Sequence, residues 1–162
     1  MEIEYTFVMI RPGAIRREVD DNIIDRILDI GLTIELCERK MLTEDFINEH
    51  YAHLRDESVP ADVFERAKKE NLSGEVIGLL VSGEKAITRM RILIGPGNVK
   101  EAREKSPNCI RAGGSIFDST DNLIHASDSQ INAVIECKRF FDVDITDTNQ
   151  FPRQLKKEKT TP

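Results

Sequence analysis

The sequence predicts a single α+β domain in which helices cover a small β-sheet. Two observations favour this class: predicted strands and helices alternate along the chain, and the predicted helices repeat their apolar residues at a helical spacing. The chain of 162 residues is long enough to bury a core, and its 40% hydrophobic and 32% charged residues are the usual balance of a soluble globular protein.

The first half of the chain is predicted to contain two strands and three helices. Residues 5–10 are almost continuously apolar, which is typical of a buried strand. Residues 15–28 carry apolar side chains four apart and predict one helix, and the alternation over 32–36 predicts a half-buried strand. Helices are then expected at 44–54 and 62–71.

The second half is predicted to supply the remaining two strands. Residues 76–81 are apolar throughout and predict a central strand, followed by a helix at 84–94. Periodicity then fails over 96–122, apart from a candidate helix at 99–105, and a loop of this length in a compact domain is usually functional or disordered. A short strand around His125 and a helix over 129–140 follow.

Composition excludes several classes of protein. The net charge of −6 speaks against nucleic-acid binding through bulk electrostatics. Three scattered cysteines (Cys37, Cys109 and Cys137) are too few for a disulfide framework or a zinc site and predict reduced thiols. The start of the chain does not read as a signal peptide, and no apolar run approaches the ~20 residues of a membrane span. We therefore expect a cytoplasmic protein without membrane contact.

The clearest chemistry lies in Asn-Leu-Ile-His-Ala-Ser-Asp-Ser, residues 122–129. A strand ending on His125 and a helix capped by Asp128 or Ser129 would hold the imidazole at a strand–helix junction. Glu136 follows about two helical turns beyond Ser129. A carboxylate that binds one ring nitrogen fixes the tautomer and leaves the other nitrogen free as a nucleophile. For a histidine considered alone, a satisfied core residue is the more common interpretation.

This stretch resembles the active-site signature of nucleoside diphosphate kinases, in which the histidine is transiently phosphorylated, and the similarity extends over residues 5–141. The resemblance implies a ferredoxin-like βαββαβ fold: an antiparallel four-stranded sheet with additional helices, assembled into homo-oligomers (tetramers or hexamers). We therefore expect a kinase-like domain over 1–141 and a charged C-terminal tail over 142–162. That tail has no clear fold signal, and either packing on a neighbouring subunit or disorder fits its composition.

The resemblance also implies catalytic roles for residues around the histidine. Glu136 matches the carboxylate that orients the imidazole, and Ser127 matches a serine that supports this carboxylate. Tyr51, in a segment similar to the family over 49–54, matches a tyrosine that supports the histidine through its hydroxyl. Each of these side chains also fits an ordinary role on an amphipathic helix or at its start. His50 and His53, which flank the tyrosine, are expected on the surface.

Four residues match the family's nucleotide-binding positions. Arg91 and Arg111 stand where the family places its phosphate-binding pair, and arginine suits this role because its planar fork stays cationic. Asn122 matches the asparagine that binds ribose or phosphate oxygens, although a turn residue is an equal alternative. Leu54 matches a residue that lines the base site.

Three further positions depart from the family pattern. Arg11 replaces the lysine that contacts the transferred phosphate, so it is expected to act in both catalysis and nucleotide binding with a bulkier group. Val59 stands at the position of the aromatic residue that stacks on the base, unless Phe64 substitutes for it. Gly97 replaces a threonine in the nucleotide site. We expect these changes to affect nucleotide affinity more than phosphohistidine chemistry.

The predicted activity is transfer of the γ-phosphoryl group of ATP to nucleoside diphosphates, by a ping-pong mechanism through a phosphohistidine on His125. Mg²⁺ is expected to arrive with the nucleotide phosphates, since no acidic cluster resembles a dedicated metal cage. One alternative is a diverged, weakly active relative that binds nucleotides or partner proteins. Another is a nucleic-acid-binding ferredoxin-like module, which the acidic charge and the absence of an aromatic-rich, Lys/Arg-flanked strand disfavour.

Overall fold

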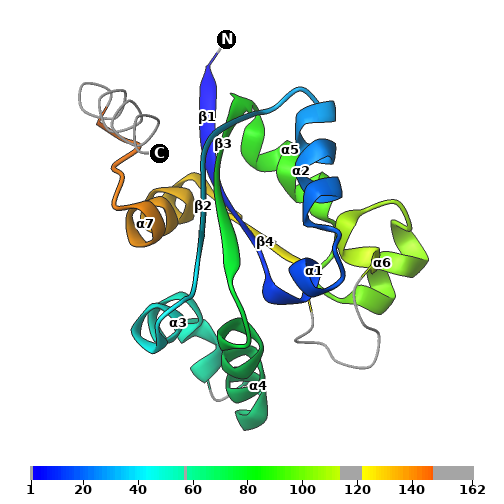
Figure 1. Ribbon diagram of the computed structural model, residues 1–162, viewed down its shortest axis with the longest axis vertical. Coiled ribbons are helices and arrows are strands. Elements are labelled where there is room, and N and C mark those ends of the chain that lie inside the picture. Colours follow the sequence, from blue (N-terminus) through cyan, green and yellow to red (C-terminus); the bar gives the residue numbers. More distant parts are fainter. Residues whose placement is uncertain (1, 57, 114–121, 148–162) are drawn as a thin grey trace.

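A four-stranded antiparallel sheet forms the centre of the protein (Figure 1). The computed structural model describes residues 2–56, 58–113 and 122–147. The strands are β1 (Ile3–Ile10), β2 (Thr33–Lys40), β3 (Val76–Glu84) and β4 (Ile124–Ala126), and their order across the sheet is β2-β3-β1-β4. This order confirms the predicted ferredoxin-like α+β class. It leaves β4, which carries His125, at one edge.

Helices cover both faces of the sheet, so alternate residues of the central strands enter two separate cores. Phe7, Met9 and Leu80 face one core, whereas Val8 and Ile10 face the other. The helices on the first face are α3 (Glu44–His50), α4 (Ala61–Leu72) and α7 (Gln130–Phe141). Those on the second face are α1 (Pro12–Arg16), α2 (Asp20–Asp29) and α5 (Ala86–Ile94).

Two helix predictions were wrong in their extent. The single helix expected over 15–28 is broken into α1 and α2, because Glu18 adopts a φ of 57°, which a right-handed helix does not tolerate. The helix expected over 44–54 ends at His50 and continues as a 3₁₀-helix, η1 (Ala52–Arg55). This earlier end brings the last residue of α3 close to β4.

The segment before β4, predicted as a loop over 96–122, contains two short helices. The candidate helix at 99–105 is confirmed as α6 (Val99–Lys105), where the Asn98 side chain caps the helix by accepting from the Glu101 N–H. A second 3₁₀-helix, η2 (Ile110–Gly113), follows and buries Arg111.

The buried core extends beyond Phe141. Val143 and Ile145 are both buried and belong to the core on the α7 face. The part of the predicted tail over 148–162 lies outside the described residues. Among the helices that the structure describes, none is both long and apolar enough to cross a membrane.

Gly78, in the middle of β3, provides a test of this packing. A methyl group on Gly78 would overlap the ring of Phe140, which covers it from α7. We expect Gly78→Ala to lower the free energy of unfolding by about 1–3 kcal/mol, the usual cost of overpacking a core. Gly74→Ala is the matched control, because its new methyl would make an ordinary 3.5 Å contact with Pro12. Urea unfolding of both variants measures the difference, and equal stabilities would contradict this packing.

Candidate functional site

His125 is the middle residue of β4 and pairs with Met9 of β1. Its neighbours Ile124 and Ala126 are fully buried in the core on the α5 side. Because successive side chains of a strand point to opposite faces, the imidazole faces α7 and lies 6.0 Å from the ring of Phe7. Its side chain is 26% exposed, so one part of the ring is reachable from solvent.

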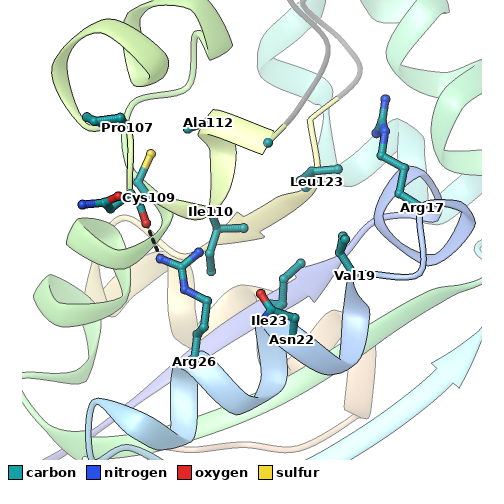
Figure 2. A pocket seen from close by; sticks show the side chains of 12 residues that line it. Arg17, Val19, Asn22, Ile23, Arg26, Pro107, Cys109, Ile110, Ala112 and Leu123 are labelled. Atoms are coloured by element: carbon teal, nitrogen blue, oxygen red, sulfur yellow. Dashed lines mark hydrogen bonds between the residues drawn. The ribbon is translucent and has the colours of Figure 1, made fainter.

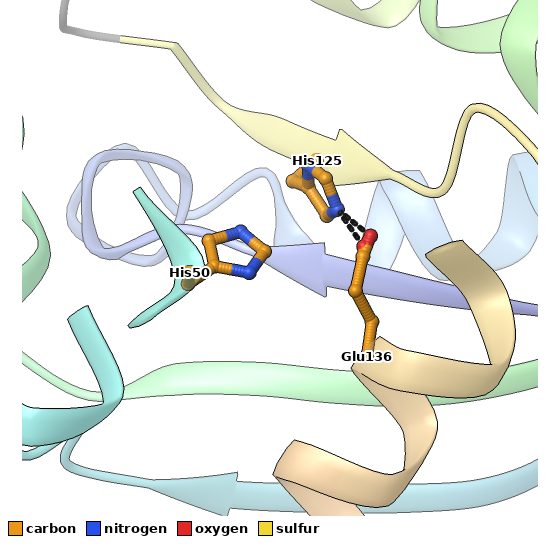
Figure 3. Close-up of side chains that lie close together, drawn as sticks. All are labelled: His50, His125 and Glu136. Carbon is orange, nitrogen blue, oxygen red and sulfur yellow. Dashed lines mark hydrogen bonds and ion pairs between the residues drawn. The ribbon is translucent and has the colours of Figure 1, made fainter. Parts of the chain in front are cut away.

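Glu136 holds one nitrogen of this imidazole. His125 Nε2 lies 2.7 Å from Oε1 and 2.9 Å from Oε2 of the buried carboxylate (Figure 3). An ionised carboxylate only accepts, so this network assigns the ring proton to Nε2. Nδ1 is on the opposite side of the ring and has no hydrogen-bond partner within the described ranges. The pair therefore leaves Nδ1 with a free lone pair.

The start of α7 explains why Glu136 reaches the histidine. Ser129 caps the helix, since its hydroxyl accepts from the Asn132 N–H at 3.2 Å, and this selects Ser129 over Asp128 as the cap. The hydroxyl of Ser127, which is fully buried, donates to Glu136 Oε1 at 3.2 Å. The predicted contacts of Ser127 and Glu136 are both present.

Three arginines gather beside the histidine strand. Arg111 is buried and donates to the backbone oxygens of Gly95 and Ile124 at 2.9 and 3.3 Å. Arg91 is exposed on α5, and its Nη1 donates to the carbonyl of Ala126 at 3.4 Å. Arg11 is only 7% exposed and follows β1 directly.

These cations lack anionic partners. Within the part of the chain that the structure describes, no carboxylate forms an ion pair with any of the three arginines. Among the described residues, the guanidinium of Arg11 forms one hydrogen bond, from Nε to Asn71 Oδ1 at 3.4 Å. Burial, and then repulsion from Arg91 and Arg11, lowers the pKa of Arg111 to about 10, so it remains charged at neutral pH. Unpaired buried charge is costly, and the cluster is therefore suited to an anionic ligand.

Asn122 and Gly97 lie against Arg111. Asn122 Oδ1 accepts from Arg111 Nε at 3.2 Å, and its Nδ2 donates to the carbonyl of Gly97 at 3.2 Å. Gly97 is exposed, and a Cβ there would lie 4.0 Å from Arg111 Nη1. The structure therefore brings these two predicted nucleotide-binding residues together with one of the predicted arginines.

A cavity of about 640 Å³ opens in front of His125. Tyr51, Arg91 and Glu136 line it together with the histidine. The ring of Tyr51 contacts His50 at a centroid distance of 4.7 Å, and the Arg11 guanidinium lies 5.8 Å from the Tyr51 ring centroid. The cavity thus presents a nucleophile, a carboxylate and cationic groups on one surface.

The predicted base-site residues are not gathered there. Val59 is half-buried and lines a separate hollow of about 740 Å³ with Phe64 and Arg55. Phe64 is buried, and the Arg55 guanidinium lies over its ring at 4.4 Å, so its face is already covered. The side chain of Leu54 lies outside what the structure describes.

A third hollow, of about 550 Å³, lies between α2 and residues 107–113 (Figure 2). Arg26 reaches across it and donates to the carbonyl of Asn108. Cys109, Ile110 and Leu123 also line this hollow. No predicted catalytic or nucleotide-binding residue lines this hollow, whereas His125, Tyr51, Glu136 and Arg91 line the cavity at His125. Arg11, Arg111, Asn122 and Gly97 are not among the residues that line that cavity.

Sequence analysis missed two residues of the site. His50 was expected on the surface, and this prediction was wrong: it is 8% exposed and contacts His125. Its position directly before Tyr51 in a segment similar to the family was the only available signal. Asn71, which is fully buried, holds Arg11. A polar residue on the buried side of α4, with Phe64 and Ala67, was the signal for it. His53 is exposed, as predicted.

The buried environment of His50 leads to a prediction about acid stability. Burial, and then the charges of His125, Arg139, Arg11 and His53, lowers the pKa of His50 to about 2. Below pH 6.5 the unfolded chain therefore binds a proton that the folded chain excludes, so stability falls as pH falls. We expect this group to cost about 1.6 kcal/mol in total between pH 6.5 and about 5, with a slope that approaches about 1.4 kcal/mol per pH unit well below pH 6.5.

Urea unfolding at several pH values tests this expectation. His50→Phe should lose less stability than the natural protein over that range, because it has no proton to exclude. His53→Ala, which changes an exposed histidine, should follow the natural protein. An identical pH dependence in His50→Phe would contradict the neutral, buried state of His50.

One group of side chains in the described ranges could ligate a metal: His50, His125 and Glu136, whose ligand atoms lie within 4.8 Å of one another. Two of its three donors are nitrogens, whereas Mg²⁺ prefers oxygen ligands in octahedral geometry. The donor set therefore does not suit a resident magnesium ion.

Comparison with known proteins identifies relatives across nearly the whole described chain. The family profile described as "Nucleoside diphosphate kinase" matches residues 4–145. The nucleoside diphosphate kinase of Methanocaldococcus jannaschii is 35% identical over 141 residues, which cover 87% of this chain and 95% of that protein. A thioredoxin domain-containing protein 3 homolog of Heliocidaris crassispina is 40% identical over 141 residues, but the match covers 86% of this chain and only 16% of that longer protein.

The solved structures that resemble this fold include two nucleoside diphosphate kinases. The nucleoside diphosphate kinase of Aquifex aeolicus superposes with a TM-score of 0.78 at 33% identity, covering 86% of this chain and 96% of that one. The nucleoside diphosphate kinase of Encephalitozoon cuniculi also gives a TM-score of 0.78, at 30% identity, covering 93% of this chain and 97% of that one. The sheet and the helices that cover it are therefore shared with these enzymes.

Proposed function

The chain belongs to the nucleoside diphosphate kinase family, and we propose that it transfers the γ-phosphoryl group of ATP to nucleoside diphosphates through a phosphohistidine on His125. The observation that carries this proposal is the pair of His125 and Glu136: the carboxylate holds Nε2 and leaves Nδ1 a free lone pair. Three arginines that have no carboxylate partner in the described part of the chain contact the backbone of the histidine strand or of the residue before it. The alternative, a diverged binder without activity, is not favoured, because the full-length relatives and the solved structures described above are nucleoside diphosphate kinases.

In the first half-reaction, His125 Nδ1 attacks the γ-phosphorus of ATP. An N–P bond forms, the bond from phosphorus to the β,γ-bridging oxygen breaks, and ADP leaves with that oxygen. In the second half-reaction, a β-phosphate oxygen of an acceptor nucleoside diphosphate attacks the same phosphorus and the N–P bond breaks. Both products leave the same cavity, which gives ping-pong kinetics.

Glu136 is proposed to stabilise the charge that develops on the imidazole. As Nδ1 forms its bond to phosphorus, the ring gains positive charge while Nε2 keeps its proton. The carboxylate 2.7 Å from Nε2 is positioned to balance this charge without moving. Ser127, which donates to the same carboxylate, holds it in place.

Arg11, Arg91 and Arg111 are proposed to bind the phosphate chain. Phosphoryl transfer depends on in-line positioning and on neutralising charge at the phosphate oxygens. The two Nη groups of Arg11 make no hydrogen bond within the described ranges, so they are available for bidentate contacts with phosphate oxygens. Asn122 and Gly97, which contact each other beside Arg111, would border the nucleotide. We keep Tyr51 as a supporting residue and Leu54 and Val59 as base-site candidates.

Magnesium is proposed to enter as part of the substrate, bound to the nucleotide phosphates. The donor set around His125 does not suit Mg²⁺, and the phosphate oxygens of ATP supply the ligands that this ion prefers. In the bound complex the ion would spread the negative charge of the transferred group, while the arginines contact the remaining oxygens.

Assembly, compartment and the domain limit remain proposals that rest on the family resemblance. We propose a cytoplasmic homo-oligomer, a tetramer or a hexamer. The tail predicted over 142–162 has a charged composition, but Val143 and Ile145 at its start belong to the buried core. Light scattering during size-exclusion chromatography measures the mass in solution. A monomeric mass would contradict the oligomer and would leave the chemistry of His125 unaffected.

Isotope transfer tests the proposed reaction. The protein is incubated with magnesium and γ-labelled ATP, freed of nucleotide by gel filtration, and then mixed with unlabelled GDP. We expect acid-labile label on the protein and its complete transfer to GTP. Absence of protein-bound label, with ADP binding still measurable, would contradict the proposal. Label that is stable to acid would indicate a different acceptor side chain.

A further inference from the structure

His50 lies directly against the reactive histidine. It is the last residue of α3, and its ring centroid is 4.6 Å from that of His125 with an interplanar angle of 82° (Figure 3). This distance and angle describe an edge-to-face contact between two aromatic rings. The contact comes from a direction different from that of Glu136, which approaches from α7.

Contacts on several sides hold His50 in place. The ring of Phe46 stacks on it at 5.6 Å with an angle of 22°, and Tyr51 meets it at 4.7 Å with an angle of 89°. Arg139 Nη1 lies 3.3 Å from His50 Nδ1, and Arg139 Nε forms an ion pair with Glu49 at 3.4 Å. A buried ring with this many contacts cannot rotate freely, so it presents a fixed surface to the His125 ring.

The neighbours of His50 also keep it uncharged. Arginine only donates, so Nδ1 of His50 must accept from Arg139, and the ring proton is assigned to Nε2. The groups that face His50 are Arg139 from α7, Arg11 after β1, His125 from β4, His53 from η1 and the Glu136 carboxylate, which has an oxygen within 4.8 Å of a His50 ring nitrogen. This carboxylate is hydrogen-bonded to His125 and Ser127, and burial, followed by the surrounding positive charges, lowers the pKa of His50 to about 2. His50 therefore touches His125 without placing a positive charge beside it.

His125 needs a second support of this kind. Its hydrogen bonds to Glu136 fix Nε2 but leave the ring able to tilt about that contact, which would move Nδ1 away from an in-line approach to phosphorus. In the described ranges the ring has two aromatic neighbours: Phe7, at 6.0 Å and 49°, and His50, at 4.6 Å and 82°. The closer of the two is His50.

We propose that His50 is a positioning residue for phosphoryl transfer, whose neutral ring holds His125 with Nε2 on Glu136 and Nδ1 free to attack. This inference rests on the proposed function, because it assigns His50 a role in the same reaction. It predicts that a flat, uncharged ring at position 50 is needed for the rate of phosphorylation and not for nucleotide binding.

Three variants of the full chain test this role. His50→Ala removes the ring, His50→Phe keeps an uncharged ring of similar shape, and His53→Ala changes the nearby exposed histidine. Rapid-quench phosphorylation by magnesium ATP and equilibrium binding of ADP are measured for each. We expect His50→Ala to phosphorylate about 10-fold more slowly or worse, with ADP affinity changed by less than about twofold. His50→Phe should recover most of the rate, and His53→Ala should match the natural protein.

The orientation of His125 provides an independent readout. In ¹⁵N-labelled protein, the ring nitrogens of His125 should show a single tautomer protonated at Nε2, and His50→Ala should show a mixture. This measurement needs no catalysis: if the natural protein acquires no label from ATP, the proposed function fails, and the tautomer change still tests the positioning role.

Several results would overturn the inference. The first is an unchanged phosphorylation rate in His50→Ala, and the second is an unchanged His125 tautomer in that variant. The third is an equal loss of phosphorylation rate in His50→Ala and His50→Phe, which would show that the ring contact does not determine the rate. Parallel loss of ADP binding and rate in both His50 variants would assign His50 a structural role only.

Discussion

Replacing His125 with alanine is expected to abolish phosphoryl transfer from ATP to GDP. The substitution removes the only atom in the cavity that has a free lone pair next to an orienting carboxylate, within the described ranges. Loss of a covalent nucleophile reduces turnover by at least about 10⁴-fold in enzymes of this type of mechanism. Steady-state transfer assays with labelled ATP measure the loss.

Binding of ADP separates this effect from unfolding. The arginines that are proposed to bind the phosphates belong to other segments, and Arg111 is held by Gly95, Asn122 and Ile124 rather than by the imidazole. ADP affinity in His125→Ala should therefore stay within about threefold of that of the natural protein. Residual transfer above about one per cent would show that another side chain accepts the phosphoryl group.

Replacing Arg11 with methionine is expected to produce the second-largest loss. Removing one preorganised donor from a site that stabilises developing charge costs about 10²–10³-fold in rate. Arg11 is 7% exposed, only its Nε has a hydrogen-bond partner in the described part of the chain, and it adds to the repulsion around Arg111. The stability of the nucleotide-free protein should therefore be unchanged within about 1 kcal/mol, or should increase, because an uncompensated buried charge is removed.

Arg16→Met is the matched control for this variant. Arg16 lies in the following helix, is half-exposed and pairs with Glu70 at 2.8 Å, so its loss should leave the transfer rate unchanged and alter stability by no more than about 1 kcal/mol. Transfer assays and urea unfolding are run on both variants. If Arg11→Met kept its full rate but lost several kcal/mol of stability, Arg11 would be a structural residue.

The pair of His125 and Glu136 could be predicted from local signals in the sequence, whereas the arginines, Asn122, Tyr51 and the role of Ser127 were predicted from the family resemblance. The apolar strand before His125 and the cap at Ser129 define a strand–helix junction, and the helical repeat places Glu136 within reach of the imidazole. The central strand over 76–81 was equally clear, since a fully buried strand is apolar throughout. These features depend on neighbouring residues only.

The remaining features depend on distant packing. Nothing in the local pattern shows that Glu18 takes a left-handed conformation, because glutamate rarely does so and the apolar spacing continues past it. His50 looked like a surface residue because its contacts, Arg139 and His125, come from segments far along the chain. The covered face of Phe64 likewise results from Arg55, which the sequence cannot place.

The position of the phosphoryl group on the imidazole tests the central claim most directly. Phosphorylated, ¹⁵N-labelled protein is prepared with magnesium ATP and kept at alkaline pH, where phosphohistidine survives, and correlation NMR then identifies the nitrogen bonded to phosphorus. The arrangement of His125 and Glu136 predicts phosphorus on Nδ1 with the proton retained on Nε2. Phosphorus on Nε2, or on any residue other than His125, would contradict the account.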